Sequence, residues 1–273
     1  MEKYSIFFIS DHTGITVETL GYSVLTQFSG LNFEFHAIPF MNSLPKAEAA
    51  RAEIDADFSN KGVSPVVFSS VTNVELRMII KQSNAVVFDL FEIFLPPLEN
   101  AFEQSSIHAL GKSHGMSDSV KYGSRIEALN FALNSDDGVN FKNYNRADII
   151  LVGVSRTGKT PTCLYLALQF GIFASNYPMT DGDLETFELT KLLRPYRDKL
   201  YGLTIEPGQL QRIRQERKPD SVYASLQQCQ KEVRTVVELF NQENIPYLDV
   251  TNFSVEEIST TIMYEKGWQR GQI

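Results

Sequence analysis

The chain has 273 residues, of which 43% are hydrophobic and 21% charged, a balance typical of a globular protein with one or two domains. Its net charge of −8 lacks the basic footprint of a nucleic-acid-binding protein, so we expect no nucleic-acid partner. The two cysteines, Cys163 and Cys229, form neither a metal-binding spacing nor a disulfide framework. No signal peptide or membrane span is predicted, so we expect a cytoplasmic protein without a membrane partner.

The first half of the chain predicts alternating strands and helices. Strands are expected at 4–9, 33–40, 66–68 and 86–89, with helices at 15–25, 46–58 and 74–81. Such a series predicts an open, mostly parallel sheet with helices on both faces. A polar loop, 103–122, a helix at 125–133 and a turn at 134–138 follow. We place the domain boundary after this turn, so that the domains are 1–140 and 141–273.

The second half opens with a short apolar strand, 149–152, and a glycine-rich loop that matches the phosphate-binding pattern G-x-x-x-x-G-K-[ST]. A helix is expected directly after it, at 159–170, with Pro161 in its first turn and Gly171 at its end. The predicted phosphate-contacting residues are Gly153, Val154, Ser155, Arg156, Thr157, Gly158, Lys159 and Thr160.

The residue types of this loop suit phosphate binding. Its glycines allow backbone N–H groups to point inward, and the following helix adds the positive end of its dipole. Lys159 would place an ammonium on the outermost phosphate, and the Thr160 hydroxyl suits Mg²⁺. The alternative is a glycine-rich turn that binds no phosphate, and the surrounding strand and helix favour the phosphate loop.

The rest of the chain continues the α/β pattern. Strands are expected at 172–175, 200–205 and 246–250, and helices from Pro207, at 222–242 and after a capping box formed by Ser254 and Glu257. The predicted fold class is therefore α/β, with two mostly parallel-sheet parts of which the second has a P-loop nucleotide-binding core.

Two further groups of residues near predicted loops could carry chemistry. Asp11 and His12 follow the first strand, where open α/β sheets place ligands, and Asp11 there could deprotonate a hydroxyl. Capping of the next helix by Asp11 or Thr13 is an equal alternative. His108 and His114 could contact phosphate, although solvated loop histidines are the favoured interpretation.

Two charged runs have a structural and a functional interpretation. Asp136-Asp137-Gly138 could ligate Mg²⁺, yet an ordinary turn is favoured. No strand ending in Asp resembles a Walker B partner. The basic run of Arg212, Arg214, Arg217 and Lys218 could clamp phosphates, but a solvated helix face is favoured.

Seven segments of the chain are distinctive when taken together. They are I-S-D-H-T-G-I-T-V-E (9–18), K-Y-G-S-R-I-E-A-L (121–129), G-V-S-R-T-G-K-T-P-T (153–162), N-Y-P (176–178), G-L-T-I-E-P (202–207), I-R-Q-E-R (213–217) and T-N-F-S-V-E-E-I (251–258). These segments resemble one bacterial and plastid family, the regulatory proteins of pyruvate, phosphate dikinase and phosphoenolpyruvate synthase. The resemblance extends from Tyr4 to about Met263, with departures at His12, where Gly is common, and at Gln227, where Arg is common.

The resemblance implies a bifunctional serine/threonine kinase that takes phosphate from ADP and inactivates the dikinase or the synthase by threonine phosphorylation. It also implies the reverse reaction, in which inorganic phosphate removes the group and pyrophosphate is released. In this scheme Lys159 and Mg²⁺ on Thr160 neutralise charge, and Asp11 is the expected base. A homodimer is compatible with the sequence.

Two other functions fit the phosphate loop alone. One is a P-loop kinase that phosphorylates a small metabolite with ATP. The other is a non-catalytic regulator that senses the nucleotide level. Nothing between Gly153 and Thr160 distinguishes ADP from ATP, so the preference for ADP depends on the resemblance.

Overall fold

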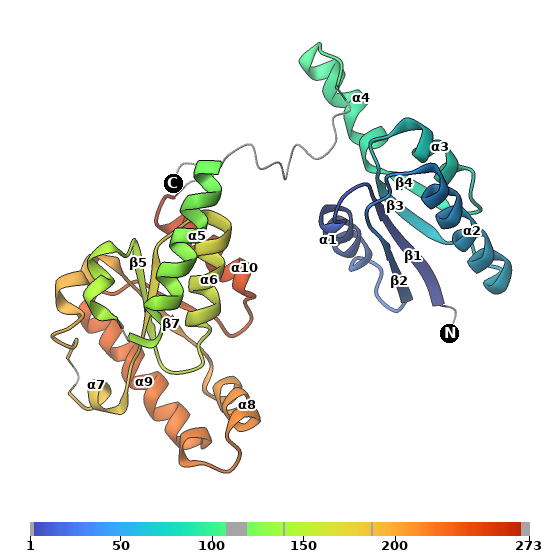
Figure 1. The fold of residues 1–273 in the computed structure, drawn as a ribbon. Coiled ribbons are helices and arrows are strands. Elements are labelled where there is room, and N and C mark those ends of the chain that lie inside the picture. Colours follow the sequence, from blue (N-terminus) through green and yellow to red (C-terminus); the bar gives the residue numbers. More distant parts are fainter. Residues whose placement is uncertain (1–2, 108–118, 139, 187, 269–273) are drawn as a thin grey trace. The chain divides into compact units, whose positions relative to one another are not determined.

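The computed structural model describes residues 3–107, 119–138, 140–186 and 188–268, in two units that are considered separately (Figure 1). Unit 1 comprises Met1–Gly115 and unit 2 comprises Met116–Ile273. Each contains a four-stranded sheet in which every neighbouring pair of strands is parallel. The α/β fold class predicted from the sequence is confirmed.

Unit 1 alternates strands and helices, and its sheet has the order β2-β1-β3-β4. Its elements are β1 (Lys3–Ser10), α1 (Ile15–Leu25), β2 (Asn32–Ile38), α2 (Leu44–Lys61), β3 (Val66–Ser70), α3 (Val74–Lys81), β4 (Val86–Asp89) and α4 (Leu90–Phe102). The central strand β1 is buried over six consecutive residues, as expected for a parallel strand covered on both faces. Phe7 and Ile9 pack in the cluster that includes residues of α2 and α3, whereas Ile6 and Phe8 pack with Val17 of α1.

Unit 2 repeats this topology with the order β6-β5-β7-β8. Its strands are β5 (Ile149–Gly153), β6 (Ala174–Pro178), β7 (Leu200–Thr204) and β8 (Tyr247–Asp249). Its α-helices are α5 (Ser119–Asn134), α6 (Lys159–Phe170), α7 (Asp181–Glu185), α8 (Pro207–Arg217), α9 (Leu226–Glu243) and α10 (Val255–Glu265). Short 3₁₀ helices are η1 (Asp136–Gly138), η2 (Phe141–Arg146), η3 (Arg194–Lys199) and η4 (Val222–Ala224).

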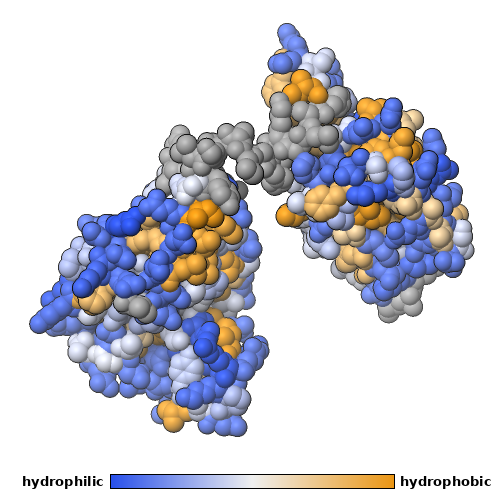
Figure 2. Space-filling model, in the orientation of Figure 1, coloured by the Kyte–Doolittle hydropathy of each residue, from blue (hydrophilic) through white to orange (hydrophobic). Residues whose placement is uncertain are grey.

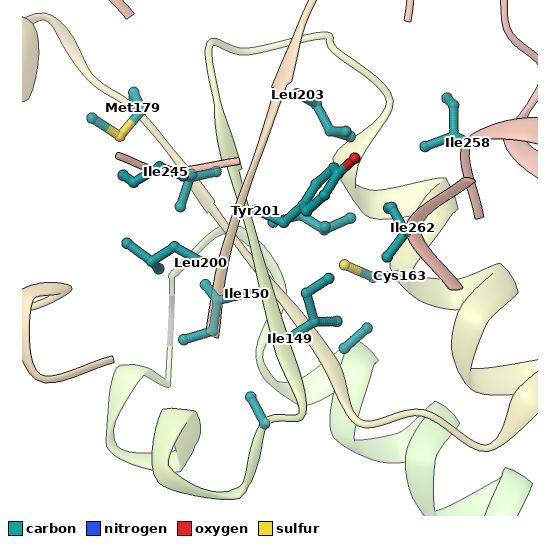
Figure 3. Packing of buried hydrophobic residues seen from close by; sticks show 14 of the residues in the cluster. Ile149, Ile150, Cys163, Met179, Leu200, Tyr201, Leu203, Ile245, Ile258 and Ile262 are labelled. Atoms are coloured by element: carbon teal, nitrogen blue, oxygen red, sulfur yellow. The ribbon is translucent and has the colours of Figure 1, made fainter. Parts of the chain in front are cut away.

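The core of unit 2 forms around β5 and β7, whose residues are all buried. Figure 3 shows Ile149 and Ile150 of β5 among side chains from other elements, including Tyr201 of β7 and Ile262 of α10. Because the two central strands are fixed by packing along their whole length, the loops at their carboxyl ends start from a rigid base.

Several element boundaries differ from the sequence-based prediction. The helix α5 packs against α6, and Ala128 and Phe131 join the core of unit 2, so the division precedes α5 instead of following the turn near residue 140. The helix α4, with Pro96 and Pro97 inside it, was not predicted. The strand β6 lies at Ala174–Pro178 instead of 172–175, and α9 begins after its N-cap Ser225 because Val222–Ala224 form a 3₁₀ turn.

The surface of unit 1 carries exposed hydrophobic side chains on α4, among them Ile93, Phe94, Leu98 and Phe102. Figure 2 shows orange, hydrophobic surface on part of this helix. Within the part of the chain that the structure describes, no helix combines the length and the apolar character that crossing a membrane requires.

Candidate functional site

The loop between β5 and α6 lies at the switch point of the unit 2 sheet. The chain leaves β5 toward β6 on one side, and then returns to form β7 on the other side. Open parallel sheets bind ligands at the carboxyl ends of the strands where this reversal occurs. The predicted strand, loop and helix around Gly153–Thr160 are therefore present in the order and place that a ligand site requires.

Close approach of the backbone explains the first glycine of the loop, and left-handed geometry explains the second. A Cβ atom on Gly153 would lie 2.2 Å from the carbonyl oxygen of Leu203, so only glycine lets β5 and β7 meet there. Gly158, the N-cap residue of α6, has a left-handed φ of 79°, which glycine adopts without strain. Arg156 also has a positive φ, 80°, which is unfavourable for a residue with a side chain.

Lys159 is nearly buried at the start of α6, with 5% of its surface exposed. Its Nζ donates to the carbonyl oxygen of Val154 over 2.7 Å, so the ammonium is folded back over the loop. Burial lowers the pKa of Lys159 to about 8, and the negative charge of Asp137 opposes this shift. The Lys159 ammonium is poorly solvated and is held by a neutral carbonyl of its own loop. An anion in the pocket could therefore replace the Val154 carbonyl as its partner and form a stronger, charge-assisted hydrogen bond.

A carboxylate lies beside the Thr160 hydroxyl, although no Walker B strand was predicted. Thr160 Oγ1 donates to Asp136 Oδ1 over 2.8 Å, and Asn176 of β6 donates to the same carboxylate oxygen. The Asn176 side-chain oxygen accepts from the backbone N–H of Asp137 over 3.1 Å. Asn176 thus holds the Asp136–Gly138 turn against the loop. The segment is a turn, as favoured from the sequence, and it also belongs to the site.

A pocket of about 680 Å³ opens over the loop, and both charge types line it. Its wall includes Lys159 and Asp137, together with the basic residues Arg156, Arg217 and Lys218. The remaining lining residues are Ser155, Gly158, Thr160, Pro161, Pro178, Ile213 and Tyr223. One carboxylate among several cations allows the pocket to attract a phosphate and to exchange a proton in the same place.

The basic run on α8 is not a uniform solvated face. Arg212 is exposed, while Arg217 and Lys218, also exposed, line the pocket. Arg214 is fully buried and forms an ion pair with Glu232 of α9 over 2.6 Å. The solvated-face interpretation is therefore wrong for Arg214. Its acidic partner lies 18 positions along the chain, so local spacing gave no sign of the pair.

Asp11 lies in unit 1, on the loop after β1, which is the switch point of that sheet. Its Oδ2 accepts hydrogen bonds from the backbone N–H and from the hydroxyl of Thr72, over 2.8 and 2.7 Å. The N-cap residue of α1 is Gly14, and no described side chain caps the helix, so the capping interpretation of Asp11 or Thr13 is wrong. His12 lies next to Asp11 and is half-buried. His108 and His114 lie outside the described residues.

Known proteins are similar to this chain over nearly its whole length, including residues of both units. The family model described as kinase/pyrophosphorylase matches residues 6–263. A Legionella pneumophila (strain Corby) protein is 50% identical over 270 residues, 99% of either chain, and an Ectopseudomonas mendocina (strain ymp) protein is 50% identical over 268 residues, 98% of either chain. Both carry the provisional name phosphoenolpyruvate synthase regulatory protein. The chain belongs to the kinase/pyrophosphorylase family.

Proposed function

We propose that the protein transfers the β-phosphoryl group of ADP to a threonine of phosphoenolpyruvate synthase or of pyruvate, phosphate dikinase. It also removes this group with inorganic phosphate. The observation that carries the proposal is that Lys159 and Asp137 line one pocket above a loop with the phosphate-binding pattern. Membership of the kinase/pyrophosphorylase family supports both directions, and the names of the relatives support the synthase as the target.

In the forward reaction the target threonine donates its hydroxyl proton to Asp137 while its oxygen attacks the β-phosphorus of ADP. The bond from that phosphorus to the bridging oxygen breaks, and AMP leaves. Lys159, with Arg217 and Lys218 on the pocket wall, stabilises the negative charge on the phosphoryl and leaving oxygens. Phosphoryl transfer needs mainly positioning and charge stabilisation, which this set of side chains provides.

In the reverse reaction inorganic phosphate occupies the loop, and one of its oxygens attacks the phosphorus of phosphothreonine. The attacking phosphate hydroxyl gives its proton to Asp137, the bond to the threonine oxygen breaks, that oxygen takes the proton from Asp137, and pyrophosphate leaves. Toward the threonine oxygen, the same carboxylate thus serves as base in one direction and acid in the other. The same cations stabilise phosphate in both directions, which explains how one pocket could catalyse opposing reactions.

Mg²⁺ fits the residues beside the loop. Thr160 and Asp136 offer a hydroxyl and a carboxylate oxygen 2.8 Å apart, and Mg²⁺ combines one or two such ligands with phosphate oxygens and water. No cluster of three or more His, Cys, Asp or Glu able to hold a metal occurs in the described residues, so phosphate oxygens would complete the coordination. When bound, the ion would neutralise charge on the phosphates.

Asp11 remains the candidate base from the sequence. Its carboxylate is held by two hydrogen bonds from Thr72, on the loop that follows β3 of unit 1. We favour Asp137 because it shares a pocket with Lys159. Parallel Asp11→Asn and Asp137→Asn variants separate the two assignments.

The test is incubation of the protein with each purified target enzyme and ADP labelled in the β-phosphate. We expect label on a target threonine, release of AMP, and loss of the label as pyrophosphate when inorganic phosphate is added. ATP that is labelled in its terminal phosphate and freed of ADP should leave the target threonine unlabelled. Lys159→Met should abolish transfer, while Lys231→Met, which changes an exposed lysine of α9, should not.

The two alternatives give different outcomes in the same assay. A metabolite kinase would transfer phosphate from clean ATP to a small molecule and leave both target proteins unlabelled. A nucleotide sensor would bind ADP and the target without transferring label. Either result would replace the proposed function.

A further inference from the structure

A buried ion pair between α8 and α9 contacts the loop between β5 and α6. Arg214 of α8 is fully buried, and its guanidinium donates to both carboxylate oxygens of Glu232 on α9, over 3.1 and 2.6 Å. Burial works to lower the pKa of Arg214, but the hydrogen bond and charge of Glu232 outweigh it and raise the pKa. Removing such a pair from water is costly, and apolar side chains of similar size often give equal stability. Its contacts with the loop suggest a further role.

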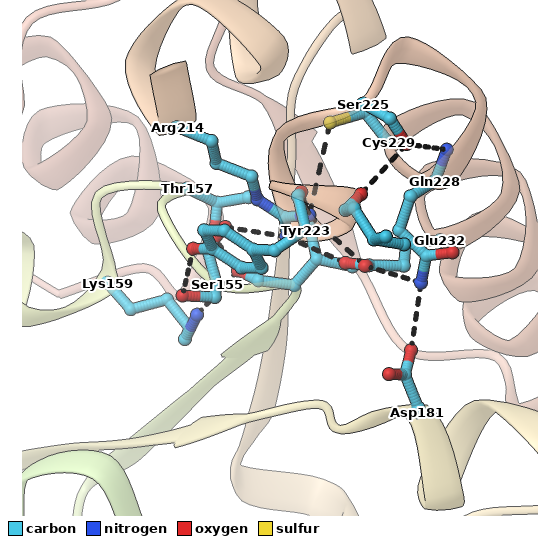
Figure 4. Close-up of polar contacts among 12 residues, drawn as sticks. Ser155, Thr157, Lys159, Asp181, Arg214, Tyr223, Ser225, Gln228, Cys229 and Glu232 are labelled. Atoms are coloured by element: carbon cyan, nitrogen blue, oxygen red, sulfur yellow. Dashed lines mark hydrogen bonds and ion pairs between the residues drawn. The ribbon is translucent and has the colours of Figure 1, made fainter. Parts of the chain in front are cut away.

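The same guanidinium reaches the loop and a nearby ring (Figure 4). Arg214 Nη2 donates to the carbonyl oxygen of Ser155 over 3.1 Å, and the guanidinium stacks on the Tyr223 ring, 4.1 Å from its centroid. The Tyr223 hydroxyl in turn donates to Ser155 Oγ over 3.0 Å. We call Arg214, Tyr223 and Glu232 the Ser155 anchor. It holds Ser155 by its carbonyl and by its side chain.

Holding this carbonyl also sets the next N–H group. The peptide bond is planar and trans, so the carbonyl of Ser155 and the N–H of Arg156 point in opposite directions. Because the carbonyl points toward the buried Arg214, the N–H of Arg156 points away from it. Arg156 lines the pocket and has the left-handed φ of 80°, a conformation that persists in non-glycine residues when the surroundings impose it.

We infer that Arg214 is a positioning residue, which turns the peptide between Ser155 and Arg156 so that the Arg156 N–H faces a phosphate in the pocket. The inference rests on the proposed function, in which this pocket binds inorganic phosphate and the β-phosphate of ADP. Arg214 itself does not contact the phosphate. Its effect passes through one backbone hydrogen bond, and Tyr223 supports it at the Ser155 side chain.

A purely structural role for Arg214 makes a different prediction. If the ion pair only joins α8 to α9, a well-packed apolar replacement of both partners should leave phosphate binding unchanged. If Arg214 orients the loop, the same replacement should keep the fold but release the Ser155 carbonyl. Phosphate affinity and the state of the Arg156 N–H therefore separate the two roles.

The test uses the full chain with Arg214→Met and Glu232→Leu combined, so that no buried charge is left without a partner. We expect inorganic phosphate to bind about tenfold or more weakly by calorimetry, since one oriented donor to an anion is lost. The Tm should stay near that of the unmodified protein. In ¹⁵N-resolved spectra, the Arg156 amide signal should lose most of its shift on phosphate addition.

A matched control comes from a second Arg–Glu pair in unit 2. Arg197 contacts the Glu243 carboxylate over 3.3 Å and also donates to its backbone carbonyl, and neither residue lines the pocket. Arg197→Met combined with Glu243→Leu repeats the chemistry away from the loop and should bind phosphate normally. If the first double variant does not fold, Arg214→Lys carries the test, since one ammonium keeps a charge near Glu232 but cannot reproduce the forked contacts.

Normal phosphate affinity in a folded anchor variant, with the Arg156 amide shift intact, would overturn the inference. The proposed function fails separately. If the unmodified protein binds neither phosphate nor ADP, the pocket is not a phosphate site, and the inference is overturned with it. If the unmodified protein binds phosphate and both double variants weaken it equally, the effect is general and Arg214 has no positioning role.

Discussion

Lys159→Met should make the ligand-free protein more stable while removing its function. The lysine is nearly buried, and its pKa falls from the ordinary value of 10.5 to about 8. Each tenfold change in proton affinity corresponds to about 1.4 kcal/mol, so carrying the charge costs the fold about 3 kcal/mol at neutral pH. Methionine keeps the packing and removes the charge. Loss of the hydrogen bond to the Val154 carbonyl lowers the stability by about 1 kcal/mol. The cost is no larger because that carbonyl still accepts from the Thr157 hydroxyl. A net gain of about 2 kcal/mol remains.

The stability gained in Lys159→Met should depend on pH, because the pKa of Lys159 is lower in the folded than in the unfolded chain. Below pH 8 both the folded and the unfolded lysine are protonated, and the full cost is present. Between about 8 and 10.5 the unfolded chain binds more protons than the folded chain, so the stability of the unmodified protein rises with pH. The advantage of Lys159→Met should therefore be largest below pH 8 and shrink above it.

The measurement is thermal unfolding without phosphate or nucleotide, at several pH values from 7 to about 9.5. At neutral pH we expect Tm to rise by about 5 °C, since a unit of this size gains a few degrees per kcal/mol. Lys231→Met, on the exposed surface of α9, is the control and should change little. A lower Tm for Lys159→Met at neutral pH, or an advantage that grows with pH, would refute the reasoning.

Three further outcomes are expected. Affinity of the unmodified protein for ADP should fall as pH rises through about 8, because the ligand-free Lys159 loses its charge there; calorimetry that shows constant affinity up to pH 9 would contradict this. Asp137→Asn should slow both phosphorylation and its reversal by about a hundredfold with little change in ADP binding, and the same result from Asp11→Asn instead would move the base to unit 1. Gly153→Ala should lower the free energy of unfolding by several kcal/mol, about 3 or more, because its Cβ would meet the Leu203 carbonyl oxygen at 2.2 Å; an unchanged denaturation midpoint would show that β5 and β7 separate easily.

The fold class could be predicted from local sequence because parallel strands covered on both faces are short apolar runs between helices. The strand β5 and the helix α6 lie where the pattern of apolar residues, glycines and Pro161 predicted them. The loop from Gly153 to Thr160 could also be recognised, since its chemistry depends on neighbouring residues in one segment. Local pattern failed for α4, where Pro96 and Pro97 argue against the helix that forms.

The partners of the loop were decided by tertiary structure. Asp136 and Asp137 resemble an ordinary turn until β6 pairs with β5 and brings Asn176 beside them. Arg214 resembles a solvated helix residue until α9 packs on α8 and supplies Glu232. The sequence by itself determined the segments whose structure depends on neighbouring residues. Only the order of strands and the packing of helices decided which distant charges meet at the loop, because those contacts join residues that no local spacing relates.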